Sequence, residues 1–273
     1  MEPRLLSRVA FYIFSPCLVF HLLTENQLGE GAILQMMGFA GAVLLSTALL
    51  AWLAARLLKL DRATTVVLVL AALLPNAGNF GLSVNLFAFG EQGLAYASLF
   101  FITSSILAYT VGVYIASLGR SGFREALLGL FKVPAIYAVI LALLFGRLGW
   151  ELPTPFARAT SVLADAAIPT MLVLLGMLLR QARWSGKIPA LATASFLRLI
   201  ASPAIAFAIA GFFGLQGAAR QAGILEAAMP TAVMVTVIAS EFEVEAEFLT
   251  AIVFTSTLLS PLTITPILAL LTQ

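Results

Sequence analysis

Apolar residues run along the whole chain in long blocks, which are separated by short turns that contain glycine, proline or charged residues. Each block has about the 20 residues that a helix needs to cross the hydrocarbon core of a bilayer. The blocks lie at residues 5–24, 31–58, 63–90, 92–118, 125–146, 156–179, 188–214, 219–240 and 246–271. The pattern therefore predicts an all-α integral membrane protein with nine transmembrane helices.

The composition leaves no room for a sizeable soluble domain. Of the 273 residues, 61% are apolar and 10% are charged, whereas a soluble domain carries about 25% charged residues. The formal net charge of +2 indicates no nucleic acid or other polyanion as a partner. The single cysteine, Cys17, rules out an intrachain disulfide and a cysteine-based metal site. We expect neither a metal nor a cofactor.

Basic residues collect in alternate loops of the predicted helix order. Eleven of the 15 Lys and Arg residues fall on the side of the amino terminus. They are Arg4, Arg8, Arg56, Lys59, Arg62, Arg120, Arg124, Lys132, Arg180, Arg183 and Lys187. Because basic loops stay in the cytoplasm, we expect a multi-pass protein of the cell membrane with its amino terminus in the cytoplasm and its carboxyl terminus outside.

Three short stretches recur 152 to 155 residues later in the chain. The pairs are Phe14–Val19 with Ala167–Leu172, Leu73–Asn76 with Ala228–Thr231, and Thr103–Leu107 with Thr255–Leu259. A displacement of five spans is odd, so the second copy would be inverted, as in many secondary transporters. The first copy has four spans and the second has five. The partner of the span that carries Pro134 would precede Met1, so either the chain lacks this helix or its start lies downstream of the real one.

One stretch has a more specific composition than the rest. Leu74-Pro75-Asn76-Ala77-Gly78-Asn79-Phe80-Gly81-Leu82, together with Phe14–Phe20 and Ala228–Ala232, resembles the auxin efflux carrier family. Bacterial members of that family are commonly assigned as permeases for malate, malonate or similar carboxylates. The resemblance implies the fold of bile-acid/sodium symporters, with ten helices in two inverted repeats of five and two broken helices that cross at mid-membrane. This chain would have a 4+5 arrangement instead.

The resemblance also implies a division of the chain into a scaffold and a transport core. Residues 1–25 and 120–182 would form the scaffold, while residues 26–119 and 183–273 would form the two repeats of the core. We expect the core to slide against the scaffold in an elevator-type alternating-access cycle. A homodimer through the scaffold is implied as well, although the missing helix belongs to that scaffold.

Two prolines near the middle of their spans mark the candidate substrate site. Pro75 and Pro230 each remove a backbone donor and free the carbonyl four residues earlier, that of Ala71 or Glu226. Two antiparallel breaks can then present helix amino termini to an anion and carbonyl ends to a cation. The candidate substrate-binding residues are Pro75, Asn76, Gly78, Asn79, Gly81, Pro230 and Thr231. The alternative is a pair of simple proline kinks whose asparagines bond to neighbouring helices.

Hydroxyl side chains on two neighbouring spans add a possible lining for this crossover. The candidates are Thr103, Ser104, Thr255 and Ser256. Their repeat-related positions favour a lining role, while close helix packing by small residues is an equally good explanation.

Three ionisable residues lie inside predicted spans, where charge is costly and indicates function. Glu226 precedes Pro230 by one turn and could carry a coupling proton or bind a cation. Arg198 could neutralise a substrate carboxylate, or it could be a structural partner of Asp165 or Glu226. The coupling ion, H⁺ or Na⁺, stays open at this point.

The predicted function is a secondary carrier that exports or exchanges small organic anions. The chain has no His-Glu-x-x-His, Gly-x-Ser-x-Gly or Gly-x-x-x-x-Gly-Lys motif, so we expect no enzyme activity and no ATP-driven pumping. Two alternatives are a sodium-coupled importer of organic anions and a truncated membrane scaffold that transports nothing.

Overall fold

The computed structural model describes residues 3–25, 28–116, 134–179, 187–242 and 244–272. The elements in these ranges are helices and helical turns. Besides them, one isolated antiparallel bridge joins Pro75 and Thr231. The predicted all-α class is therefore confirmed for the described residues. The basic residues Arg120, Arg124, Lys132, Arg180 and Arg183 lie outside these ranges.

The helices follow one another with short connections. The first half contains α1 (Pro3–Val9), the π-helical turn η1 (Ala10–Phe14), α2 (Ser15–Glu25), α3 (Glu30–Leu57), α4 (Arg62–Leu73), the π-helical turn η2 (Ala77–Gly81), α5 (Leu82–Leu107), the π-helical turn η3 (Ala108–Gly112) and α6 (Val113–Ala116). The second half contains α8 (Pro134–Leu148), α9 (Thr154–Asp165), α10 (Ala167–Leu179), α11 (Ile188–Phe196), the π-helical turn η4 (Leu197–Ala201), α12 (Ser202–Ala210), α13 (Gly217–Ala227), α14 (Met234–Glu241) and α15 (Ala246–Leu271).

Helical segments occupy the predicted spans, with bounds that differ by a few residues. The span predicted at 125–146 is described from Pro134 onward. Within the described residues, five helices are long and apolar enough to cross a membrane: Glu30–Leu57, Ala77–Ala116, Thr154–Leu174, Ile188–Ala210 and Glu247–Leu271. The chain is thus an integral membrane protein by its apolar helices, while the total of nine spans and the inverted repeat stay predictions.

Local chemistry explains two of the helix boundaries. Asp61 begins α4, because its side chain accepts a hydrogen bond from the Thr64 N–H at 3.0 Å and so satisfies a free donor of the first turn. Gly90 has φ +65°, a left-handed conformation that favours glycine. The helix kinks there, at the boundary between the third and fourth predicted spans.

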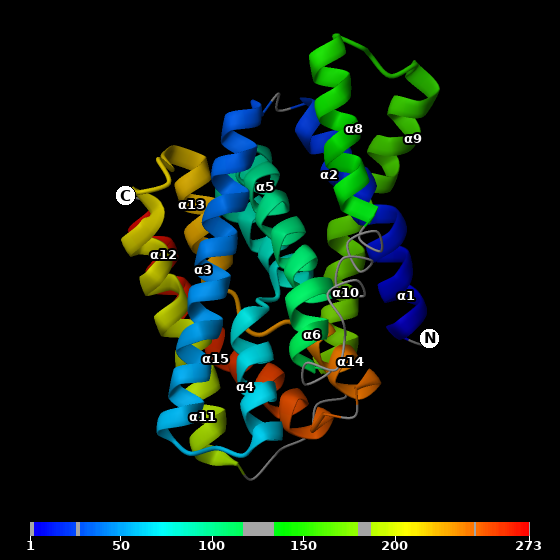
Figure 1. Cartoon of the computed structure of the whole chain (residues 1–273). Coiled ribbons are helices and arrows are strands. Elements are labelled where there is room, and N and C mark those ends of the chain that lie inside the picture. The colour runs from blue at the N-terminus through cyan, green and yellow to red at the C-terminus, as the bar shows by residue number, and fades with distance from the viewer. Residues whose placement is uncertain (1–2, 26–27, 117–133, 180–186, 243, 273) are drawn as a thin grey trace.

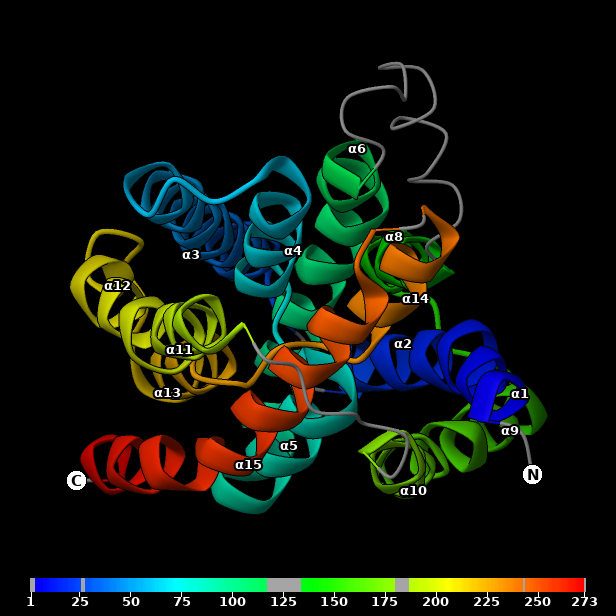
Figure 2. The ribbon, with the colours of Figure 1, turned by 90° about the horizontal axis from the view of Figure 1, so that it is seen from below.

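The helices form two groups on either side of α5 (Figures 1 and 2). In one group, α2 packs on α8 and α9, and α10 packs on α1 and α9. In the other group, α3 packs on α4, α5 and α12, while α13 packs on α5 and α12 and α11 packs on α15. These groups follow the predicted scaffold and core segments in sequence, although the division into a fixed and a moving part stays a prediction.

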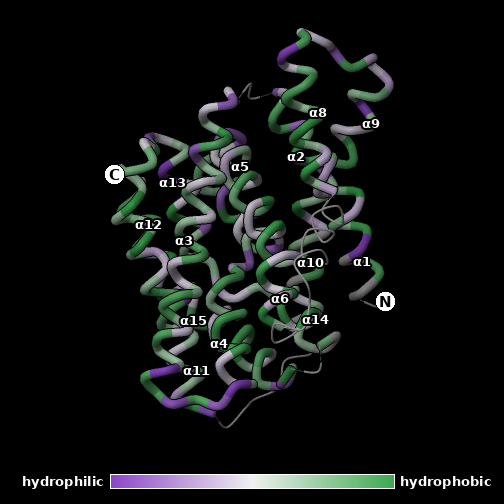
Figure 3. The backbone as a smooth tube through the Cα atoms, in the orientation of Figure 1, coloured by the Kyte–Doolittle hydropathy of each residue, from purple (hydrophilic) through white to green (hydrophobic). Residues whose placement is uncertain are grey.

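Two apolar clusters hold the groups together. The larger cluster fills the second group, with Met36, Phe39 and Phe100 among its fully buried members, and it extends into the first group through residues of α2 and α8 such as Val19 and Val139. The smaller cluster joins α2 and α10 to α5, and alanines supply half of its buried members. Polar residues gather at the ends of the molecule, such as the turn between α3 and α4 beside the start of α11 (Figure 3).

Candidate functional site

The two proline-containing breaks meet in the middle of the second helix group (Figure 1). Helix α4 ends at Leu73 and α13 ends at Ala227. After each of these ends, the backbone runs through a short non-helical stretch before the next helix begins. The Asn76 N–H donates to the Pro230 carbonyl at 2.7 Å, and the Ala232 N–H donates to the Leu74 carbonyl at 2.8 Å. Main-chain groups that would be unsatisfied in lipid therefore bond to each other across the crossover.

Thr231 completes the main-chain bonding at this point. Its hydroxyl donates to the Ala71 carbonyl at 3.1 Å, which is the carbonyl expected to be freed by Pro75. Its N–H donates to the Ser256 hydroxyl of α15 at 3.2 Å. The carbonyl of Glu226, also expected to be free, instead accepts from the Met229 N–H at 3.2 Å. The expectation of an open carbonyl at Glu226 is wrong because the end of α13 tightens into a turn.

Arg198 lies in the π-helical turn η4 and is fully buried. Its Nη1 donates to the Ala72 carbonyl at 2.6 Å, its Nη2 to the Ala227 carbonyl at 2.6 Å, and its Nε to the Met229 carbonyl at 3.1 Å. Nη2 also bonds to the Ser202 hydroxyl. All three guanidinium nitrogens thus have protein partners, so the geometry does not favour direct contact between Arg198 and a substrate carboxylate.

The predicted ionic partners of Arg198 are not its hydrogen-bond partners. Among the described residues, the ion pairs join His21 to Glu25, Arg147 to Glu30 and Lys187 to Glu245. Asp165 is an exposed residue at the end of α9, a helix that packs on α2 and α10. Backbone carbonyls and Ser202 therefore make the hydrogen bonds of Arg198, while Glu226 interacts with it electrostatically without a direct hydrogen bond.

Glu226 is fully buried on α13 beside α5. Its Oε1 accepts a hydrogen bond from Asn85 Nδ2 at 3.0 Å, and the same nitrogen lies 2.9 Å from the Gly81 carbonyl oxygen. Glu226 Oε2 and Asn85 Oδ1 are buried without a hydrogen-bond partner in the described chain. The Oε2 atom of Glu226 and the Oδ1 atom of Asn85 thus each have unused hydrogen-bonding capacity.

Sequence reasoning missed Asn85. Its position was visible, since Asn85 is an amide in an apolar stretch, nine residues after Asn76. Amides in such segments usually bond to neighbouring helices. The sequence carries no signal, however, for which residue of α13 would face it.

The candidate glycines lie against large neighbours. A Cβ atom at Gly81 would lie 2.6 Å from the carboxyl carbon of Glu226, and one at Gly78 would lie 2.8 Å from Cε2 of Phe101. A methyl group at either position would therefore require the neighbouring side chain to shift. The neighbours are a carboxyl group and an aromatic ring, whereas the sequence suggested close approach of backbones, so that expectation stays a prediction.

The side of the crossover where η2 begins, here called the amino-terminal side, is more exposed than the crossing point itself. Gly78, Asn79 and Phe80 are half-buried, whereas Pro75, Asn76, Pro230 and Thr231 are buried. The side-chain nitrogen of Asn76 has no hydrogen-bond partner among the described residues. A free amide donor therefore lies beside the beginning of η2, where helix geometry leaves main-chain N–H groups without intrahelical acceptors.

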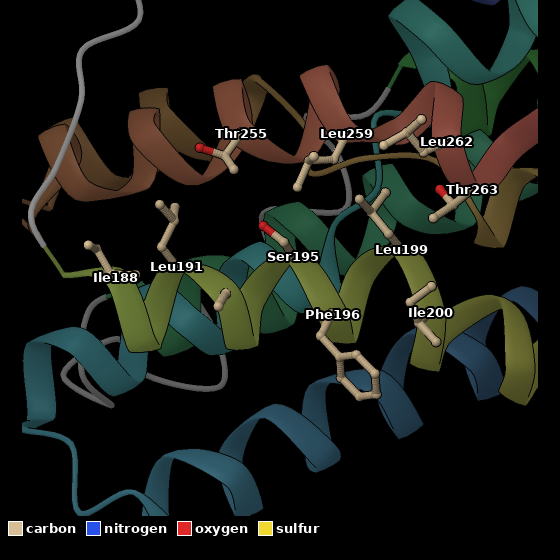
Figure 4. Close-up of a pocket in the computed structure, with 11 residues that line it drawn as sticks. Ile188, Leu191, Ser195, Phe196, Leu199, Ile200, Thr255, Leu259, Leu262 and Thr263 are labelled. Atoms are coloured by element: carbon tan, nitrogen blue, oxygen red, sulfur yellow. The ribbon is translucent and has the colours of Figure 1, made fainter.

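The four hydroxyl candidates have different surroundings. Ser256 bonds to Thr231 at the crossover, whereas the hydroxyl of Thr103 donates back to the Leu99 carbonyl of its own helix at 2.9 Å. Ser104 is buried, 5% exposed. Thr255 faces away from the crossover, into a groove between α11 and α15 (Figure 4). Of the four candidates, Ser256 is the one that forms a hydrogen bond with a residue of the crossover.

This groove has a volume of about 440 Å³ and is almost wholly apolar. Figure 4 shows Leu191, Leu199, Leu259 and Leu262 around it, with the hydroxyl of Ser195 as a rare polar group. It offers no charge that would hold an anion. Neither Arg198 nor any residue of the two breaks lines it, so the groove and the crossover are separate features.

Comparisons with known proteins place the chain among transporters. The family described as Membrane transport protein matches residues 2–124 and 120–268. An uncharacterized transporter of Methanothermobacter thermautotrophicus is 30% identical over 93% of this chain and 84% of its own length. A protein of Rhizobium meliloti, described as a candidate malonate transporter, is 30% identical over 72% of this chain and 64% of its own length. A probable auxin efflux carrier component of Oryza sativa is 31% identical over 48% of this chain and 24% of its own length.

Proposed function

The chain belongs to the membrane transport protein family, which is that of the auxin efflux carriers, and from this premise we propose that it is a secondary carrier of small carboxylates. The observation that carries the proposal is the paired break at Pro75 and Thr231, with the unpartnered amide of Asn76 beside it. The candidate malonate transporter among its relatives supports a carboxylate as the substrate class.

The carboxylate would bind on the amino-terminal side of the crossover. Helices η2 and α14 both begin there, at Ala77 and Met234, and each helix amino terminus carries about half a positive charge. The side chains of Asn76 and Asn79 would donate hydrogen bonds to the carboxylate oxygens. Such a site binds an anion without a charged side chain in contact with it, which would favour release on either side of the membrane.

Glu226 would couple transport to a proton. A buried carboxyl group is costly when it is charged, so Glu226 would be protonated in the occluded state, with the proton on Oε2, the oxygen that has no hydrogen-bond partner. As the site opens, the proton of Glu226 would exchange with water, and this exchange would link proton movement to anion movement. We propose export or exchange as the direction, through the cell membrane, with the amino terminus in the cytoplasm.

Counterflow in proteoliposomes tests the proposed site. Vesicles loaded with one dicarboxylate should take up labelled malonate or a related carboxylate from a panel, and the double variant Asn76→Ala/Asn79→Ala should lower the initial rate by at least about 100-fold, because two neutral donors to a charged group are lost. Gln92→Ala, at an exposed position of α5, is the matched control and should keep the wild-type rate.

Two outcomes would contradict the proposal. Folded wild-type protein that exchanges no member of the carboxylate panel would support the non-transporting alternative. A double variant with the wild-type rate would remove the assignment of Asn76 and Asn79 to the substrate site.

A further inference from the structure

Arg198 is the largest fully buried side chain in the described part of the protein. It lies midway along the apolar helix Ile188–Ala210, which is long enough to cross a membrane. An arginine keeps its charge in proteins, and a charge at this depth needs compensating groups. The nature of these groups suggests what the side chain replaces.

The partners of Arg198 are the carboxyl-terminal ends of the two broken helices. Ala72 lies in the last turn of α4, Ala227 is the last residue of α13, and Met229 follows in the break. One guanidinium group therefore joins two half-helices that come from opposite halves of the sequence. Ser202, one turn further along the helix, accepts from the guanidinium and donates to the Ala227 carbonyl at 2.9 Å.

The charges balance. The carboxyl end of a helix carries about half a negative charge, so the two half-helices together present about one negative charge to the single positive charge of the guanidinium. In transporters with discontinuous helices, unwound carbonyls and half-helix carboxyl ends are the groups that coordinate a coupling cation. In this protein both carboxyl ends already bind one cation, the guanidinium group of Arg198, which is covalently part of the chain.

We infer that the Arg198 guanidinium permanently occupies the place where the half-helix carbonyls would otherwise bind a coupling cation, so that this carrier uses no sodium ion at its crossover. A tethered cation cannot leave during the cycle. It stabilises the crossover in every state and moves with the anion. The inference rests on the proposed function for its transport consequence, and on the geometry of Arg198 for the rest.

Removal of the side chain should create a site that free cations can fill. We would measure the melting temperature of the detergent-solubilised protein by tryptophan fluorescence in choline chloride, in sodium chloride of equal ionic strength, and with a few millimolar guanidinium chloride added. Wild-type protein should melt at the same temperature in all three. Arg198→Ala should melt lower in choline by on the order of 10 °C, and sodium or guanidinium should restore at least half of the loss.

Arg220→Ala is the matched control. Arg220 is exposed on α13, and its described contact is with the ring of Phe207 at 5.8 Å. This variant should melt within a few degrees of wild type and should show no difference between the cations. The inference is overturned if sodium stabilises the wild type over choline, or if no cation restores any stability to Arg198→Ala.

Two further variants keep the test decisive if Arg198→Ala does not fold. Arg198→Lys retains a charge with three donors, whereas Arg198→Met fills similar space without charge. The lysine variant should melt above the methionine variant, and equal melting temperatures would overturn the inference. The measurement needs no substrate. Failure of anion exchange would therefore reject the proposed function alone, while a sodium-dependent wild type that still exchanges anions would reject this inference alone.

Discussion

At the scale of single residues, Gly81 lies directly against Glu226. A Cβ atom at position 81 would overlap the buried carboxyl group of Glu226. That carboxyl group accepts a hydrogen bond from Asn85 and is fully buried. The glycine is therefore required by its neighbour on another helix, since its own backbone conformation is helical.

This contact predicts a compensating pair of substitutions. Gly81→Ala should lower the free energy of unfolding by about 1–3 kcal/mol, because an extra methyl group enters a filled space. In the Glu226→Ala background, the same Gly81→Ala substitution should cost much less free energy of unfolding, since the shorter side chain at position 226 leaves space for the new methyl group. Thermal melts of the four proteins in a double-mutant cycle measure the coupling.

Gly41→Ala is the control for this cycle, because a Cβ atom at Gly41 meets nothing within 4 Å. It should leave the melting temperature unchanged or raise it slightly. Additive effects of the substitutions at positions 81 and 226 would show that the two residues are not in contact.

The residues of the crossover were partly predictable from the sequence. Pro75 and Pro230 indicated the breaks, because proline removes a helix hydrogen bond, but proline alone does not decide the matter, since α15 continues through Pro261 and Pro266. The partners of Arg198 and Glu226 were not predictable. Which groups face a buried ionisable side chain depends on the rotation of each helix about its axis, and a uniformly apolar helix gives no pattern from which to read that rotation.

At the scale of elements, α4 depends on a capping residue outside the apolar part of the chain. Asp61 accepts hydrogen bonds from the Thr64 N–H at 3.0 Å and from the Thr64 hydroxyl at 2.6 Å. Lys187, at the start of α11, donates to the same hydroxyl at 2.9 Å. The bonds from Thr64, first the hydroxyl and then the main chain, lower the pKa of Asp61 below its ordinary value.

The cap predicts a pH-dependent difference between two variants. Because the folded-state pKa is depressed, the ionised Asp61 contributes stability above its unfolded pKa of about 3.9 and loses it as the pH falls through the lower folded value. Asp61→Ala should therefore cost about 1 kcal/mol at pH 7, and the gap to wild type should narrow between pH 4 and pH 3. Melting temperatures across this range measure the gap.

Asp61→Asn retains a capping oxygen that does not titrate, so it should remain close to wild type at pH 7. Its difference from Asp61→Ala should be the same at both ends of the pH range. A gap between wild type and Asp61→Ala that stays constant down to pH 3 would contradict the role of the ionised cap.

The positions of the helices were predictable, but their internal irregularities were not. Helix α15 has the predicted bounds 246–271, because a charged turn precedes its apolar block. The π-helical turns at Ala10–Phe14, Ala77–Gly81, Ala108–Gly112 and Leu197–Ala201 had no signal. Each is a local change of hydrogen-bond register, and side chains that are apolar on every face do not record such a change.

At the scale of the whole molecule, the smaller apolar cluster lies between the two helix groups. Half of its buried members are alanines on η1, α5, α9, α10 and α13, namely Ala10, Ala95, Ala97, Ala164, Ala167 and Ala222, and the other half are larger side chains such as Leu18, Leu94 and Met171. The alanines allow the helices of the two groups to approach closely. We propose that residues 26–119 and 183–273 slide along this surface against residues 1–25 and 120–182 in an elevator-type cycle.

The slide predicts that a covalent bond across this surface stops transport. In a Cys17→Ser background, which has no cysteine, protein with a cysteine pair placed across α2 and α5 should lose anion exchange on oxidation and regain it on reduction. These two elements are in contact in the structure. Counterflow rates before and after oxidation measure the effect.

A cysteine pair between α3 and α4, which lie within one helix group, is the control and should leave the rate unchanged. Full exchange activity in protein that is completely cross-linked between α2 and α5 would rule out movement of the two groups past each other.

The crossover also sets an order for biosynthesis. The bond between the Thr231 hydroxyl and the Ala71 carbonyl joins residues 160 positions apart, and a ribosome needs roughly 10–30 s to add that length at about 5–20 residues per second. During this time the first break is in the membrane without the second. The nascent first half must keep its open main-chain groups near water or the insertion machinery until α13 arrives.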